Sequence, residues 1–177
     1  MKPIADPFAV ARYLELVGEM TIADRSYERE FDPAWLRLRK WKVVSAASEF
    51  GHFGPEEISR VVPVLNGAGY RQCFAVATEP LNPLPLCYDL TVSEEDFSNF
   101  RRECGLLRYL LMDEARSWAI SCYGGYKLFA GPFELLEKLL GESIPVARKN
   151  FRASVHSIDP RVTDSLLLRM ASRYENA

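Results

Sequence analysis

Two histidines are the first residues to examine, because the imidazole side chain exchanges protons near neutral pH. His52 lies in a glycine-bracketed loop, Phe50-Gly51-His52-Phe53-Gly54, between two predicted helices. In that loop it could act as a general base at the mouth of a cleft, or it could pack between the two phenylalanines. His156 lies far from it in the sequence, just before a predicted helix start. HExxH and CxxC patterns are absent, so the sequence predicts no metal site.

Four cysteines are the candidate nucleophiles: Cys73, Cys87, Cys104 and Cys122. A catalytic thiol needs an electropositive and partly exposed setting. Cys104 instead falls at the predicted C-terminus of a helix, where the helix dipole raises the pKa of a thiol. The other three have apolar or strand-like neighbours. We therefore expect four reduced thiols of a cytosolic protein, with two disulfides as the alternative.

One glycine-rich loop, Asn66-Gly67-Ala68-Gly69, is a candidate nucleotide site. In a dinucleotide-binding fold such a loop follows a strand and opens a helix. Here it follows a predicted helix and opens a strand, which is typical of a helix C-cap and turn. The serines lie in no GxSxG pattern. The sequence therefore indicates neither a cofactor nor a catalytic residue.

Cations and tryptophans are interleaved in one predicted helix, WLRLRKWKVVSAASEF, which starts at Trp35. Two tryptophans and four cations on one segment could bind a phosphate-bearing or acidic partner. The ordinary interpretation is an amphipathic helix that buries Trp35, Leu38 and Trp41 and leaves the cations in water. The four cations are Arg37, Arg39, Lys40 and Lys42.

The composition of the chain argues against several classes of function. Hydrophobic residues make up 48 % and charged residues 26 % of the 177 residues, and the net charge is −2. This balance is typical of a globular protein, and it lacks the basic footprint of non-specific nucleic-acid binding. The apolar residues form no run of about 18, and acidic residues interrupt the N-terminal segment, so neither a membrane span nor a signal peptide is predicted. We expect a cytoplasmic protein.

The elements that must position these residues are marked by proline and glycine. Asp-Pro or Gly-Pro pairs place a capping residue before a proline at the first helical position, and Ser93 begins a near capping box. These signals predict helices at about 7–19, 33–49, 55–66, 93–104, 132–140 and 160–174. Runs of β-forming residues predict strands at 71–78, 86–92, 106–112, 117–123 and 126–130.

These elements predict one α+β domain covering residues 1–177. Its mainly antiparallel sheet has about five strands, and its helices pack on the sheet and are concentrated in the N-terminal third. The Gly124-Gly125 dipeptide supplies a two-residue hairpin turn. That turn predicts that Ile120 faces Phe129, with Trp118 on the same core face, and that small apolar residues form the other face.

The segment 117–141 carries the one family resemblance in the chain. It contains a Trp-Ala-Ile strand, a turn, an aliphatic strand closing in Phe129-Ala130-Gly131-Pro132, and a leucine-rich helix. This order resembles small stand-alone bacterial immunity proteins of contact-dependent or secreted toxin systems. The resemblance implies a cytosolic protein that binds and blocks one toxin domain, and it implies no functional residue.

The sequence therefore favours a protein-binding module without enzymatic activity. Candidate contact residues lie at opposite ends of the sheet: Asp113, Glu114 and Arg116 in one turn, and Tyr123 and Tyr126 at the hairpin tip. We favour the acidic end, because no helix dipole explains its two carboxylates. One alternative is a small-molecule binding or hydrolytic enzyme with a cleft near His52. The other is a structural subunit that forms an oligomer through the second sheet face.

Overall fold

The computed structural model describes residues 1–23, 29–47, 53–79, 85–105, 107–123, 126–158, 169 and 172–174. Its centre is an antiparallel sheet made of β1 (Lys2–Pro3), β4 (Lys42–Ala47), β5 (Gln72–Ala77), β6 (Cys87–Thr91), β7 (Tyr109–Met112), β8 (Ala119–Cys122) and β9 (Tyr126–Gly131). The strand order is β1-β6-β5-β7-β8-β9-β4. A separate small sheet pairs β2 (Thr21–Ala23) with β3 (Arg29–Phe31).

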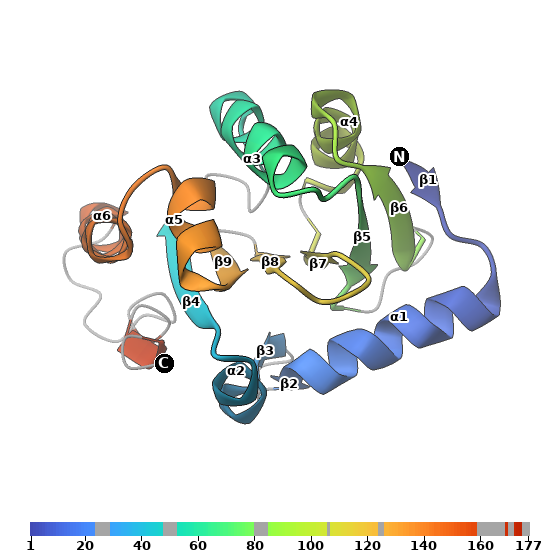
Figure 1. The fold of residues 1–177 in the computed structure, drawn as a ribbon, viewed down its shortest axis with the longest axis horizontal. Helices are drawn as coiled ribbons and strands as arrows, with labels where there is room; N and C mark the ends of the chain where they lie inside the picture. Colours follow the sequence, from blue (N-terminus) through green and yellow to red (C-terminus); the bar gives the residue numbers. More distant parts are fainter. Residues whose placement is uncertain are drawn as a thin grey trace.

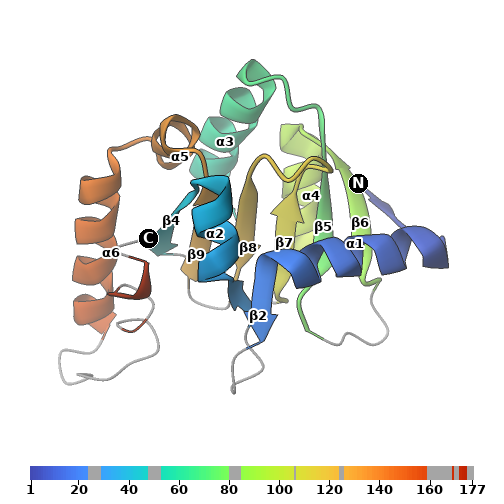
Figure 2. The same cartoon turned by 60° about the horizontal axis from the view of Figure 1, so that its bottom comes forward.

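Helices cover both faces of the large sheet (Figure 1). They are α1 (Pro7–Met20), α2 (Pro33–Arg39), α3 (Pro55–Gly67), α4 (Glu94–Cys104), α5 (Phe133–Leu140) and α6 (Ile144–Ile158). One hydrophobic cluster lies under α3, α4 and α5, and a second lies between the sheet and α1, α2 and the small sheet. Figure 2 shows α1 and α2 on the same side of the sheet, with α6 beside the edge strand β4.

At Asp6, Asp32 and Ser93 the capping signals place the helix starts correctly. Asp6 and Asp32 accept hydrogen bonds from the first backbone N–H groups of α1 and α2. Ser93 caps α4 through the N–H of Asp96 at 3.2 Å. Each side chain satisfies a donor that the helix leaves without an intrahelical partner, which is why these short sequence signals predict the starts.

The predicted helix at 33–49 is wrong beyond its second turn. Helix α2 ends at Arg39, where Lys40 adopts a left-handed conformation and its N–H bonds back to the carbonyl of Arg37. The chain then enters β4, whose Val43 and Val44 are buried. β-Branched side chains favour the extended conformation, and pairing with β9 rewards it, so the strand replaces the helix.

The expected five strands and the N-terminal concentration of helices also need correction. In the part of the chain that the structure describes, the large sheet has seven strands, because β4 and the two-residue β1 add to its edges. Helices α4, α5 and α6 lie in the second half of the chain. Helix α6 was not predicted, although Ser143-Ile144-Pro145 marks its start. The expected helix at 160–174 falls largely outside the described residues.

The central register agrees with the prediction. Ile120 pairs with Phe129, and Cys122 pairs with Lys127. Trp118, Ile120 and Phe129 have no exposed surface and share the cluster under α3, α4 and α5. The other face, which includes Ala119 and Leu128, is covered within the chain rather than by a partner. Within the described residues, no helix combines the length and apolar content needed to cross a membrane.

Candidate functional site

The turn between β7 and β8 is held by its own carboxylate. Asp113 is 7 % exposed, and its Oδ1 accepts hydrogen bonds from the N–H groups of Ser117 at 2.5 Å and Trp118 at 3.3 Å. The Arg116 N–H also donates to the Asp113 carbonyl at 3.0 Å. An aspartate that bonds backbone groups a few residues ahead stabilises a turn. Asp113 is therefore part of the scaffold, and its carboxylate needs no external partner to explain it.

The next residues of the turn are tied to α1. The carboxylate of Glu114 lies 2.7 Å from the guanidinium of Arg12, and Arg116 forms an ion pair with Glu19. The Arg12 and Glu114 side chains are 62 % and 53 % exposed, so this pair contributes little to stability. It still limits where the carboxylate can point. The turn thus presents Glu114 at the surface in a defined position.

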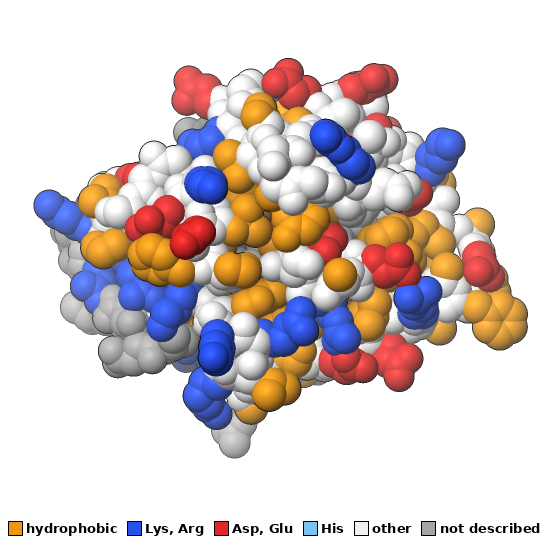
Figure 3. All heavy atoms as spheres, in the orientation of Figure 1, with side chains coloured by type: hydrophobic (Ala, Val, Ile, Leu, Met, Phe, Trp, Pro, Cys, Tyr) orange, Lys and Arg blue, Asp and Glu red, His pale blue; other side chains and the backbone are white. Residues whose placement is uncertain are grey.

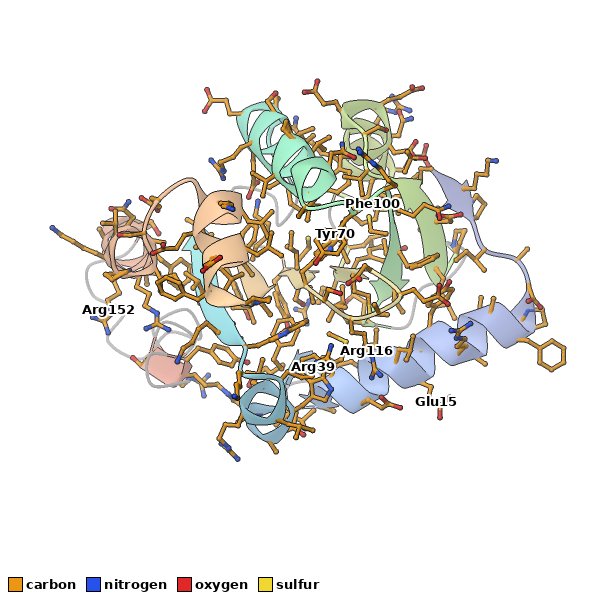
Figure 4. The ribbon with its side chains drawn as sticks, viewed as in Figure 1. Glu15, Arg39, Tyr70, Phe100, Arg116 and Arg152 are labelled. Carbon is orange, nitrogen blue, oxygen red and sulfur yellow. The ribbon has the colours of Figure 1, made fainter. Side chains whose placement is uncertain are left out.

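Arg39 ties α2 to the same turn. Its guanidinium donates to the carbonyls of Arg116 at 2.9 Å and Ala115 at 3.5 Å. It also lies 5.7 Å from the ring centroid of Trp35 and 6.0 Å from that of Trp41. Figure 4 shows Arg39 and Arg116 side by side between α2 and α1. Two carbonyls and two aromatic faces fix this arginine, so α2 and the turn form one rigid surface.

We call this region the α2–turn surface. Leu38 is the most exposed apolar side chain of this surface, at 81 %, while the half-buried Trp35 lies one helical turn before it. Arg37 and Arg39 flank Leu38 in the sequence, and Figure 3 shows Lys and Arg over α2 and a mixture of Lys, Arg, Asp and Glu over α1. The residues of the α2–turn surface are Trp35, Arg37, Leu38, Arg39, Lys40, Glu114 and Arg116.

The opposite end of the hairpin does not expose the two predicted tyrosines. Tyr123 and Tyr126 are 2 % and 3 % exposed, and their rings stack at 4.6 Å between centroids. The Tyr123 hydroxyl donates to the carbonyl of Arg29 in β3, and the Tyr126 ring lies 6.4 Å from that of Phe151 in α6. The small sheet and α6 therefore cover this end, and the expected exposure of both tyrosines is wrong.

A cleft of about 750 Å³ opens between α3, α5, α6 and the strands β4 and β9. Ala47 and Gly54, which precede and follow His52 in the sequence, line it, and His52 itself lies outside the described residues. His156 lies within α6 rather than before a helix. A role for His52 therefore stays a prediction, while the cleft is a feature of the described chain.

Lys127 is the residue in this cleft that the sequence reasoning did not single out. It lines the cleft, is 2 % exposed, forms an ion pair with Glu57, and lies 5.1 Å from the Phe53 ring centroid. Lys127 lies two residues before Phe129, so the alternation of side chains along a strand puts it on the same core face. A charged residue at such a position was the available signal, because buried charges require partners.

The cysteines offer no reactive thiol. All four are free and buried. Burial raises the pKa of Cys87 to about 11 and that of Cys122 to about 12, so both thiols stay protonated at neutral pH. No group of three or more His, Cys, Asp or Glu side chains in the described ranges is arranged to hold a metal ion.

Comparisons with protein-family models, with curated proteins and with solved structures found no match to this chain.

Proposed function

We propose that this chain is a protein-binding module and that the α2–turn surface is its contact surface. The single observation that supports the proposal is Leu38, a large apolar side chain that is 81 % exposed on a surface where Arg39, Glu114 and Arg116 have defined contacts. An apolar core surrounded by a polar rim is typical of protein interfaces. The site residues proposed from the sequence are revised accordingly: Glu114 and Arg116 remain, while Asp113, Tyr123 and Tyr126 are internal.

Rigidity supports a binding role for this surface. Arg39 bonds to two carbonyls of the turn, and the turn is joined to α1 by two ion pairs. A surface that is ordered before binding loses less conformational entropy when a partner arrives. Arg39, Glu114 and Arg116 are thus positioned before a partner binds.

The test replaces Leu38 with a photo-crosslinking amino acid and, in a matched control, replaces Val146 of α6 in the same way. Val146 is also an exposed apolar residue, at 44 %, and lies outside the α2–turn surface. We expect one protein to be captured through position 38 and not through position 146. That protein is then purified, and its affinity for the chain is measured by calorimetry.

Point variants decide whether the captured protein uses this surface. Leu38→Asp should weaken its binding at least tenfold, while Val146→Asp should leave it unchanged. Both substitutions are at exposed sites, so the free energy of unfolding should stay within about 0.5 kcal/mol of wild type. Equal binding of wild type and Leu38→Asp would refute the proposed surface.

The resemblance of segment 117–141 to immunity proteins supports a narrower hypothesis, in which the partner is a toxin domain. Coexpression with the captured protein tests it. Under this hypothesis the wild-type chain restores growth that the partner alone arrests, and Leu38→Asp does not. A partner that has no effect on growth would leave a binding module of another kind.

The cleft supports a second candidate function, the binding of a small molecule. Its volume of about 750 Å³ falls in the range of ligand sites, and the buried Lys127–Glu57 pair lies on its wall. A fragment screen by NMR, with Ala47→Trp as a variant that fills the cleft, tests this candidate. Fragments that bind wild type but not Ala47→Trp would support it, and the absence of any such fragment would exclude it.

A further inference from the structure

Backbone conformation singles out two cations of the α2–turn surface. Lys40 has a φ angle of 55° and Arg116 has one of 54°. No other non-glycine residue in the described part of the chain has a positive φ. Glycine is the residue that adopts this left-handed region without steric cost, so a long side chain is disfavoured there. Both exceptions are cationic; Arg39 precedes Lys40 in the sequence and donates to the carbonyl of Arg116.

The fold does not require either side chain. The cap of α2 uses the backbone N–H of Lys40, which glycine would supply equally well. Arg116 gains an ion pair with Glu19, but the two side chains are 26 % and 51 % exposed. An ion pair this exposed to water stabilises the protein by less than a left-handed non-glycine residue destabilises it. Strained residues that the fold does not explain are frequently functional residues.

Two cations close to Leu38 in the sequence indicate the kind of partner that this surface binds. Arg37 and Lys40 are exposed, and neither has an acidic partner among the described residues. The surface thus carries two available positive charges on a chain whose net charge is −2. Arg39 and Arg116, by contrast, already have partners within the chain.

A nucleic acid does not fit this arrangement. Glu19 and Glu114 lie among the cations, where they would repel a continuous phosphate backbone. A phosphate backbone also offers no apolar surface to the exposed Leu38, whereas a protein partner can offer one. A partner whose separate carboxylates surround an apolar pocket matches the surface better, because its carboxylates can pair with the cations and avoid the two glutamates.

We propose that the partner is a protein segment whose carboxylates pair with Lys40 and Arg37 around an apolar contact to Leu38, an inference that rests on the proposed function. The left-handed Lys40 is retained for this contact at the expense of stability. Two results are therefore expected from Lys40→Gly: the melting temperature rises, and the affinity for the partner falls.

The probe is a phage-displayed library of random peptides selected against the wild-type chain. We expect the enriched peptides to combine Asp or Glu with a large apolar residue. One selected peptide, labelled with a fluorophore, should bind the double variant Arg37→Gln/Lys40→Asn at least tenfold more weakly than wild type. Asn accepts the left-handed conformation, so this variant removes charge without adding strain. Lys149→Gln, an exposed lysine of α6, is the control and should bind as wild type does.

Several outcomes would overturn this inference. In the selection, they are the absence of any enriched peptide and the enrichment of neutral or basic peptides. In the binding assay, they are an equal loss of binding in the Lys149→Gln control, and displacement of the labelled peptide by a DNA duplex at a lower concentration than the unlabelled peptide needs. Lys40→Gly with unchanged affinity would also contradict it. Capture of a partner through position 38 together with any of these results would leave the proposed function standing and remove only the acidic partner.

Discussion

The turn at Asp113 offers the sharpest test of the structure, because Asp113→Ala removes the acceptor of two backbone hydrogen bonds. Hydrogen bonds to a charged group contribute about 1.5–3 kcal/mol each. The hydrogen bond from the Ser117 N–H is short, at 2.5 Å, so its contribution should fall in that range. The bond from the Trp118 N–H is longer, at 3.3 Å, and should contribute less. We therefore expect Asp113→Ala to lower the free energy of unfolding by about 2–3 kcal/mol. Asp113→Asn keeps a neutral acceptor and should cost about 1 kcal/mol.

Urea unfolding followed by circular dichroism measures these changes. With a slope of about 2 kcal/mol per molar, the midpoint of Asp113→Ala should fall by about 1 M or slightly more. Glu114→Ala is the matched control, since its carboxylate is half exposed, and it should change stability by less than about 0.5 kcal/mol. Equal stability of Asp113→Ala and Glu114→Ala would show that the carboxylate of Asp113 does not hold the turn.

Three further predictions follow from buried groups. Trp118→Ala should cost about 3–5 kcal/mol in the same urea assay, because the Trp118 side chain has no exposed surface; an unchanged midpoint would contradict the register of β8. The four buried thiols should resist alkylation at pH 8 in the native protein and should all react after unfolding, as measured by mass spectrometry; fast native labelling would contradict their burial. For Asp96, burial raises the pKa, but hydrogen bonds from the Met1 ammonium and the Thr91 N–H outweigh it and hold the pKa below its ordinary 3.8. Its stabilisation is therefore present above about pH 4 and is lost as the pH falls through the lowered pKa of the folded state. The stability difference between wild type and Asp96→Asn should shrink between pH 5 and pH 2, and a constant difference would refute the assignment.

Local signals in the sequence predicted local structure well. Asp6, Asp32 and Ser93 mark helix starts because each side chain bonds an N–H within its own first turn. The pairing of Ile120 with Phe129 follows from a two-residue turn and the alternation of side chains along a strand. In these cases every group that decides the conformation lies within a few positions of the signal.

Distant contacts decided what the sequence did not predict. Val43 and Val44 continue the apolar spacing of Trp35, Leu38 and Trp41, so only their pairing with β9 reveals a strand. Distant contacts also decided which residues of the candidate site are exposed. Tyr123 is at a hairpin end, but its hydroxyl bonds to Arg29, which is far away in the sequence. Asp113 looked like a surface acid because its acceptor role depends on how the turn folds back.

The two edge strands of the sheet determine the order in which the protein can be completed during its synthesis. Strands β1 and β4 leave the ribosome early, but Pro3 pairs with Tyr88 and Val44 with Phe129. The strands from β5 to β9 pair with partners that lie closer in the sequence and can assemble first, since the entropic cost of closing a loop grows with its length. The apolar β4 must therefore wait, unprotected by its own sheet, until β9 has been made. A ribosome that stalls before residue 126 leaves this strand open to aggregation or to a chaperone.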